Sequence, residues 1–146
     1  MKKLLYETNR KLHKTFFMAE TKAIKPTESE LEILQVLWMK GQATVREVHE
    51  KLLITKDVGY TTTLKLMQIM FEKGLVKRDD SSRTHIYMPA CNKEHTQKEL
   101  LGKFITSLFG GSSSQLVLQA LGSHEVTQKE LDDIQQLLNQ LKNKDK

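Results

Sequence analysis

The chain has 146 residues, of which 38 % are hydrophobic, and a formal net charge of +5. This length holds one ordinary domain, or a small domain with an oligomerisation region. A single cysteine, Cys91, excludes an internal disulfide framework and fits a reducing compartment. No apolar run approaches the roughly 20 residues of a membrane-spanning helix, and residues 1–17 lack the apolar stretch of a secretory signal. We therefore expect a cytoplasmic protein without membrane insertion.

The excess positive charge is confined to the N-terminal arm. Residues 1–26 hold seven Lys and Arg against two Glu, whereas residues 27–90 hold nine basic and nine acidic residues, and residues 91–146 hold seven of each. The net charge is therefore no evidence that the rest of the chain binds nucleic acid. We expect residues 1–25 to be a flexible basic arm. A basic amphipathic helix is an alternative, and Met18 could be the true initiator.

Residues 27–74 predict three short helices. Thr27 with Glu30 forms a capping box that starts the first helix. Thr44 with Glu47 forms a second capping box and starts the second helix. In each of the three helices, residues that can pack against a core recur at helical spacing. These residues are Leu31, Leu34, Leu37 and Trp38 in the first helix, Val45, Val48 and Leu52 in the second, and Thr63, Leu66, Met67 and Met70 in the third.

Residues 75–89 predict a β-hairpin, because two β-rich segments flank a turn at residues 80–82. Three helices followed by a hairpin are the layout of a winged helix-turn-helix, whose third helix usually lies in the DNA major groove. Polar side chains of the third helix could contact phosphates and base edges, and basic side chains of the hairpin could contact the flanking backbone. The candidates are Thr61, Thr62, Lys65 and Gln68 on the helix, and Lys77, Arg78, Arg83 and His85 on the hairpin. Ordinary solvated positions are the alternative.

Three further helices are expected over residues 96–109, over residues 114–121 and from Thr127 onward. Their apolar residues have little to bury against within about fifty residues, so pairing with a second copy in a symmetric dimer is expected. The candidate dimerisation residues are Phe104, Leu108, Leu116, Leu131, Ile134, Leu138 and Leu141. The fold class is therefore mostly α with a small β-hairpin: a winged helix over residues 26–90, then a helical dimerisation domain over residues 91–146.

The sequence offers no catalytic or metal-binding constellation. Cys91 and His95 are only two potential ligands, which do not make a zinc or copper site. Residues 112–114 are serines outside any nucleophile elbow, and there is no Gly-rich phosphate loop. We therefore expect no enzymatic activity, no cofactor and no metal, and a structural role for Cys91.

Several segments carry a family resemblance. Pro-Thr-Glu-Ser-Glu-Leu-Glu-Ile-Leu at 26–34, Ala-Thr-Val-Arg-Glu-Val at 43–48, Tyr-Thr-Thr-Thr at 60–63 and Glu-Lys-Gly-Leu-Val at 72–76 resemble the penicillinase-repressor (BlaI/MecI) family of winged-helix transcriptional regulators. The resemblance extends over about residues 26–142. It implies a homodimer that represses transcription by occupying a palindromic operator on double-stranded DNA.

The same resemblance implies a release mechanism. Family members are controlled by a membrane metalloprotease sensor, and the repressor is cleaved in the helix that follows the wing. The matching pair is Lys103-Phe104; the Phe is kept, and Lys replaces the Asn of the staphylococcal members. The chain lacks the C-terminal Cys-x-Cys motifs of the copper-responsive branch.

Two other classes fit the same pattern. A ligand-responsive regulator of the MarR type also flanks a winged helix with dimerisation helices. Alternatively, the winged helix could be a protein-interaction module without DNA binding, which the balanced charge of residues 27–90 allows.

Overall fold

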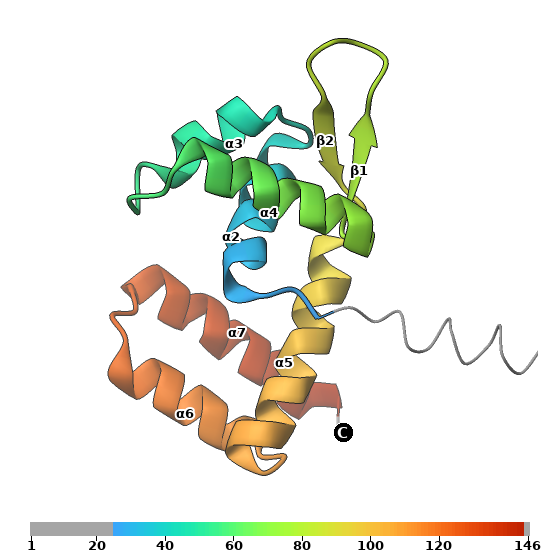
Figure 1. Ribbon diagram of the computed structural model, residues 1–146. Coiled ribbons are helices and arrows are strands. Elements are labelled where there is room, and N and C mark those ends of the chain that lie inside the picture. The colour runs from blue at the N-terminus through green and yellow to red at the C-terminus, as the bar shows by residue number, and fades with distance from the viewer. Residues whose placement is uncertain (1–24, 145–146) are drawn as a thin grey trace, which may run out of the picture. The chain divides into compact units, whose positions relative to one another are not determined.

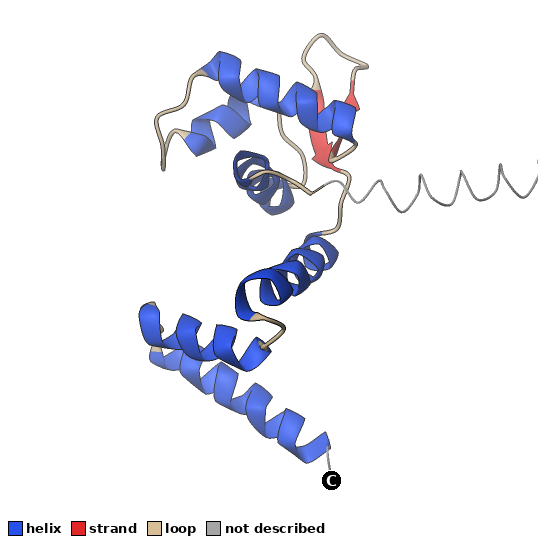
Figure 2. Ribbon diagram, turned by 60° about the horizontal axis from the view of Figure 1, so that its bottom comes forward, coloured by secondary structure: helices blue, strands red, loops and turns tan. Residues whose placement is uncertain are grey.

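The computed structural model of the protein describes residues 25–144, so the expected basic arm, except for Lys25, and the alternative start at Met18 lie outside the described residues. The elements are α2 (Glu28–Lys40), α3 (Val45–Leu52), α4 (Tyr60–Lys73), β1 (Val76–Asp79), β2 (Ile86–Pro89), α5 (Lys93–Phe109), α6 (Ser113–Ser123) and α7 (Gln128–Lys144) (Figure 1). Within the described part, strands occur only in the hairpin (Figure 2). The mostly helical fold class with a small hairpin is confirmed.

The chain divides into two compact units, Met1–Gln97 and Lys98–Lys146. The division falls inside α5, seven residues after the boundary at residue 90 that the sequence suggested. The first unit holds α2, α3, α4 and the hairpin, which is the element order of a winged helix-turn-helix.

Local sequence signals fix where the helices of the first unit begin. The Thr27 hydroxyl accepts from the Glu30 N–H at 3.3 Å, and the Glu30 carboxylate accepts from the Thr27 N–H at 2.9 Å. Thr44 and Glu47 make the same reciprocal pair at 3.2 and 2.8 Å. Each capping box satisfies two backbone donors that the helix itself leaves without acceptors. Both predicted helix starts are confirmed.

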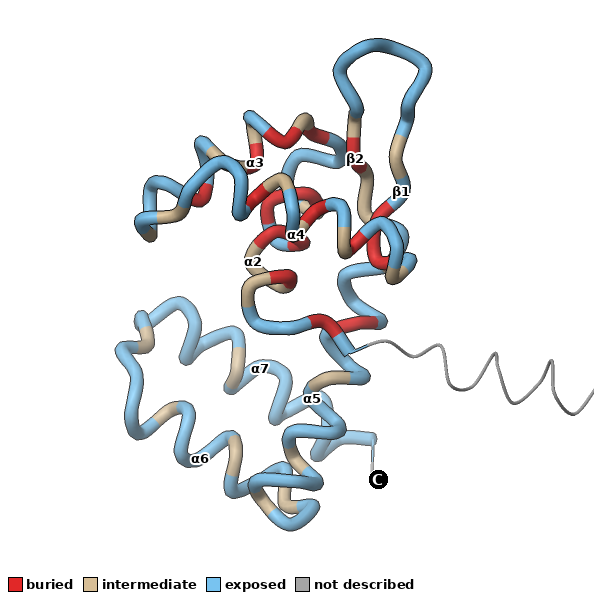
Figure 3. Tube along the Cα trace, in the orientation of Figure 1, coloured by how far each residue is buried: buried red, intermediate tan, exposed pale blue. Residues whose placement is uncertain are grey.

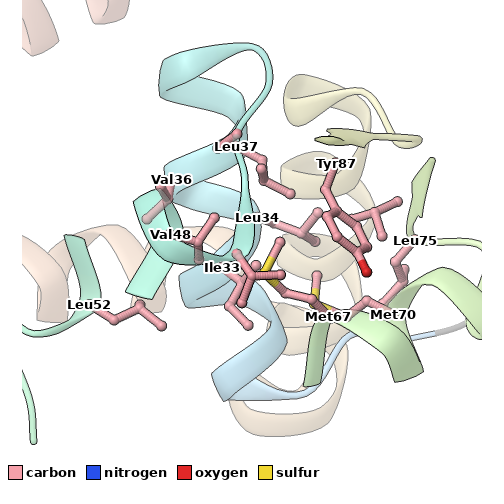
Figure 4. Close-up of a cluster of buried hydrophobic side chains, with 13 residues drawn as sticks. Ile33, Leu34, Val36, Leu37, Val48, Leu52, Met67, Met70, Leu75 and Tyr87 are labelled. Carbon is pink, nitrogen blue, oxygen red and sulfur yellow. The ribbon is translucent and has the colours of Figure 1, made fainter. Parts of the chain in front are cut away.

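One apolar core joins the three helices to the base of the hairpin. Side chains of α2, α3 and α4 meet around Ile33 and Leu34 (Figure 4). Leu34 and Leu37 are buried as predicted, but Leu31 and Trp38 only pack against the edge of the core, whereas Ile33 and Val36 are in it. The buried face of α2 is therefore wider than the predicted stripe, because α3, α4 and β2 all pack against this helix.

The hairpin is attached to the helices through a bridge that the sequence did not predict. β1 and β2 pair antiparallel, with Val76 opposite Pro89 and Asp79 opposite Ile86. Ala43, just before α3, pairs with Tyr87: each N–H donates to the other's carbonyl, at 3.0 and 2.8 Å. The Tyr87 side chain is almost fully buried. This bridge fixes the hairpin against the start of α3.

The segment after the hairpin is also tied to the first unit. Trp38 Nε1 donates to the Cys91 carbonyl at 3.0 Å, and the Cys91 thiol lies 3.8 Å from the Leu75 carbonyl that accepts from it. These contacts agree with a structural role for Cys91. The Asn92 side chain accepts from the His95 N–H at 3.0 Å, so α5 begins at Lys93, three residues before the predicted start.

The second unit has no buried core of its own. None of the described residues from 98 to 144 is buried, and Figure 3 shows only exposed and half-buried positions along α6 and α7. The predicted capping box of Thr127 and Glu130 does start α7. The apolar side chains of these helices are therefore only partly covered within the unit.

A buried ion pair links the first and last turns of the three-helix core. The Glu30 side chain is only 2 % exposed, and its carboxylate lies 2.6 Å from the Lys73 ammonium. Burial by itself raises the pKa of Glu30, but the hydrogen bonds from Lys73 and Thr27 outweigh it, and the pKa is lowered below its ordinary value. The helix-capping residue is thus also a tertiary contact to α4.

We expect Lys73→Ala to lower the free energy of unfolding at pH 7 by about 1–3 kcal/mol, because the Glu30 carboxylate stays buried without its charged donor. A lowered folded-state pKa contributes stability above the ordinary pKa of about 4.3, and this contribution is lost as the pH falls through the folded-state value. The difference between the variant and the wild type should therefore shrink in acid. Urea unfolding followed by fluorescence of Trp38, the sole tryptophan, measures this difference.

Lys40→Ala is the matched control, because Lys40 pairs at 3.3 Å with Glu47, whose side chain is 45 % exposed. This variant should lose less stability than Lys73→Ala. Equal losses, or a Lys73→Ala loss that is the same at pH 3 and pH 7, would contradict the account.

Candidate nucleic-acid interface

The four predicted residues of α4 share the exposed side of the helix. Thr61, Thr62, Lys65 and Gln68 are all exposed, while Thr63, Met67 and Met70 of the same helix are buried against the core. Lys65 has no ion-pair partner among residues 25–144. The helix therefore presents a polar face with an uncommitted cation to the solvent.

An open cleft of about 470 Å³ lies between the start of α3, one side of α4 and the hairpin. Its lining is Thr44, Val45 and Arg46 from α3 and its cap, Tyr60, Leu64 and Gln68 from α4, and Arg78, Arg83, Thr84, His85 and Tyr87 from the hairpin. Four sequence-predicted residues thus come together here: Gln68, Arg78, Arg83 and His85. Thr61, Thr62, Lys65 and Lys77 are not part of the lining.

Arg78 is held by Asp80 of the hairpin loop and by Phe71 of α4. Its guanidinium donates to the two carboxylate oxygens of Asp80 at 2.6 and 3.2 Å and lies 4.1 Å from the centre of the Phe71 ring. Asp80, and then the Tyr87 hydroxyl, raise the pKa of Arg78. A guanidinium that is paired and stacked in this way has little free charge to offer a ligand.

The loop between the strands carries both acidic and basic groups. Arg83 and His85 lie in this loop rather than in β2, because the strand begins at Ile86. The Asp80 carboxylate is 3.6 Å from His85 Nδ1. The Asp79 carboxylate accepts from the Ser81 N–H at 2.9 Å, which lowers the pKa of Asp79. Of the three basic side chains that the hairpin brings to the cleft, only that of Arg83 has no acidic partner in the described part of the chain.

Sequence reasoning missed Arg46. It is exposed in the first turn of α3 and lines the cleft together with residues of α4 and the hairpin. The dipole of a helix favours acidic rather than basic residues in its first turn. An arginine at that position, two residues after the Thr44 cap, is the signal in the sequence that could have found it.

Other kinds of site find no support in the part of the chain that the structure describes. No three His, Cys, Asp or Glu residues between 25 and 144 are grouped so that they could hold a metal ion. None of the helices from α2 to α7 is long and apolar enough to cross a membrane.

The sequence model of the penicillinase repressor family matches residues 26–140. The chain belongs to this family. A penicillinase repressor of Staphylococcus aureus is 22 % identical over 123 residues, which cover 84 % of this chain and 98 % of that protein. A penicillinase repressor of Bacillus licheniformis is also 22 % identical, over 82 % of this chain and 94 % of the relative.

Two further relatives cover less of the chain. The transcriptional regulator BlaI of Mycobacterium tuberculosis is 29 % identical over 90 residues, which are 61 % of this chain and 65 % of that protein. Among solved structures, the DNA-binding domain of the repressor BlaI in solution matches with a TM-score of 0.44 and 22 % identity, over 47 % of this chain and 84 % of that chain.

Family membership decides the class of function. The penicillinase repressor family consists of DNA-binding transcriptional repressors and not of enzymes. The resemblance that the sequence segments carried is therefore confirmed, and so is the prediction of a winged-helix transcription regulator without enzymatic activity. The match favours this class over a MarR-type regulator and over a protein-interaction module.

Proposed function

We propose that the protein represses transcription in the cytoplasm by binding a palindromic operator as a homodimer, with α4 of each copy in the major groove of double-stranded DNA. The observation that carries this proposal is the exposed polar face of α4 next to a basic hairpin. An α-helix fits the major groove of B-DNA, and groups that flank it then face the sugar–phosphate backbone.

The exposed polar side chains of α4 fall into two groups by length. Thr61 and Thr62 are short hydroxyls in the first turn, suited to phosphate contacts, while Lys65 and Gln68 are long enough to reach guanine or adenine edges. On the hairpin, Arg83, Lys77 and His85 would contact the backbone and fix the register. Arg78, which Asp80 and Phe71 hold, would instead support the shape of the hairpin.

The experiment that tests operator binding is selection of duplexes from a random pool with the full chain. We expect enrichment of a two-fold symmetric sequence whose half-sites are centred one or more helical turns apart, about 10 bp per turn. Enrichment of no sequence, or of one without symmetry, would contradict the proposal.

We expect Lys65→Ala to weaken binding to the selected duplex by about 1–3 kcal/mol and to relax the sequence preference at one base pair, if Lys65 contacts a base edge. Titrations at fixed salt against the selected duplex and single-base variants measure both effects. Uniform weakening across all sequences would instead assign Lys65 to a phosphate, and no change would remove it from the interface.

Pairing of two copies is supported by the apolar surface of the second unit. Phe104, Leu131, Leu138 and Leu141 are 41–51 % exposed and Leu108 is 63 % exposed. Leu116 and Ile134 are half-buried. A stable soluble chain rarely leaves so many large apolar side chains uncovered, and a two-fold interface covers the same patch on both copies.

We expect Leu138→Asp to shift the protein toward monomer and to abolish operator binding at concentrations where the wild type is bound, because the carboxylate would be buried in the α7 contact. Sedimentation velocity measures the shift. Gln136→Asp, on the opposite side of the same helix, is the matched control and should remain dimeric. A Leu138→Asp variant that sediments like the wild type would contradict the assignment of this seam.

Release by proteolysis is the second part of the proposal. The Lys103 side chain is 52 % exposed and lies 3.7 Å from the Glu99 carboxylate, and the Phe104 ring is 48 % exposed. The bond between Lys103 and Phe104 lies inside α5, so a protease must first unwind this part of the helix. We infer that a membrane metalloprotease sensor cuts there and separates the DNA-binding unit from the dimerisation helices.

We expect incubation with the activated sensor to yield two fragments, with a new N-terminus at Phe104 that mass spectrometry identifies. Lys103→Asn restores the residue pair of the staphylococcal members and should be cleaved at the same bond at least as fast. Fragments that begin elsewhere, or an intact chain after incubation, would contradict this site.

A further inference from the structure

We propose that the cleft between α3, α4 and the hairpin binds one backbone phosphate of the operator, held by Arg46 from α3 and Arg83 from the hairpin. This inference rests on the proposed operator binding and adds α3 to the interface. Neither the sequence pattern nor the family match assigns Arg46 a role.

The free positive charge of the cleft belongs to these two arginines. Both are exposed, and neither has an acidic partner among residues 25–144. The neighbouring carboxylate of Glu47 is already committed, since it accepts from the Thr44 N–H and from the Lys40 ammonium, and the pKa of Glu47 is lowered by Thr44 and then by Lys40. Arg78, the third arginine of the lining, donates to both carboxylate oxygens of Asp80 and has little free charge.

Backbone N–H groups add hydrogen-bond donors to the positively charged cleft. The Thr44 hydroxyl accepts from the Glu47 N–H, which leaves the N–H groups of Val45 and Arg46 without an acceptor in the described part of the protein. Both residues line the cleft. Two free N–H groups at the start of a helix, in a cleft that is also lined by the guanidinium groups of Arg46 and Arg83, are donors of the kind that bind phosphate oxygens.

The two sides of the cleft are held at a fixed separation. Ala43 directly precedes the Thr44 cap of α3, and its paired hydrogen bonds with Tyr87 join that cap to β2. A bound phosphate therefore does not have to order the backbone on either side, which reduces the entropic cost of binding.

The position favours a phosphate of the DNA backbone over a base. The cleft lies to one side of the polar face that contains Thr61, Thr62 and Lys65, none of which lines it. With α4 in the major groove, groups on the flanks of the helix meet the backbone. A free phosphate shares this chemistry, so the experiment must separate the two sources.

The first arm compares the wild type with Arg46→Gln on the selected duplex as a function of salt. Because the proposed complex holds two copies, loss of one phosphate contact per copy should reduce the slope of log affinity against log salt by about 1.8, so the ratio of wild-type to variant affinity should shrink roughly twelvefold between 50 and 200 mM salt. Lys51→Gln, an exposed lysine in the last turn of α3, is the matched control and should keep the wild-type slope. An unchanged slope for Arg46→Gln would overturn the proposal.

The second arm replaces single phosphates of the duplex by neutral methylphosphonates. We expect one position in each half-site where the wild type loses affinity and Arg46→Gln loses none. Arg83→Gln should share that insensitive position. Additive losses at every position would overturn the proposal.

Titration of the DNA-free protein with inorganic phosphate at constant ionic strength is the third arm. Saturable binding that Arg46→Gln lacks would assign the cleft to free phosphate and overturn the DNA assignment; absence of such binding supports it. A wild type that binds no duplex at all would overturn operator binding itself, which is distinguishable from failure of the Arg46 contact alone.

Discussion

The candidate interface depends on one short β-bridge. Two backbone hydrogen bonds between Ala43 and Tyr87 join the hairpin to the segment that enters α3, and the buried ring of Tyr87 anchors the same point in the core. Because of this contact, the first turn of α3, one side of α4 and the loop of the hairpin line a common cleft. A two-stranded ribbon is marginally stable alone, and the bridge adds to the packing of β1 on α4 and of β2 on α2 that holds the hairpin in place.

The sequence predicted those features that local chemistry determines. Capping boxes at Thr27, Thr44 and Thr127 require only residues three positions apart, so the helix starts they define were correct. The bridge of Ala43 to Tyr87 joins residues far apart in the chain, and no local pattern encodes it. Features of this kind depend on tertiary packing, which periodicity alone cannot supply.

The same distinction explains what was missed in the candidate site. The exposed polar face of α4 follows from helical spacing, so Lys65 and Gln68 could be selected from the sequence. That Arg78 is held by Asp80 and Phe71 while Arg83 has no such partner depends on the path of the loop. Arg46 acquires its position only through the packing of α3 beside the hairpin. Helical spacing therefore selects residues of α4 that lie together on its exposed side, but it does not give the distribution of charge around them.

The two units differ in how far they bury their apolar side chains. The first unit has a buried core and an exposed polar face on α4; the second has apolar helices without a buried core, which a second copy would cover in the proposed homodimer. The most direct test is the mass, by sedimentation, of the full chain bound to a duplex with one selected palindrome. We predict two chains on each duplex, with no intermediate that holds one chain at concentrations near half-saturation. A saturated complex that holds one chain per duplex would contradict this prediction.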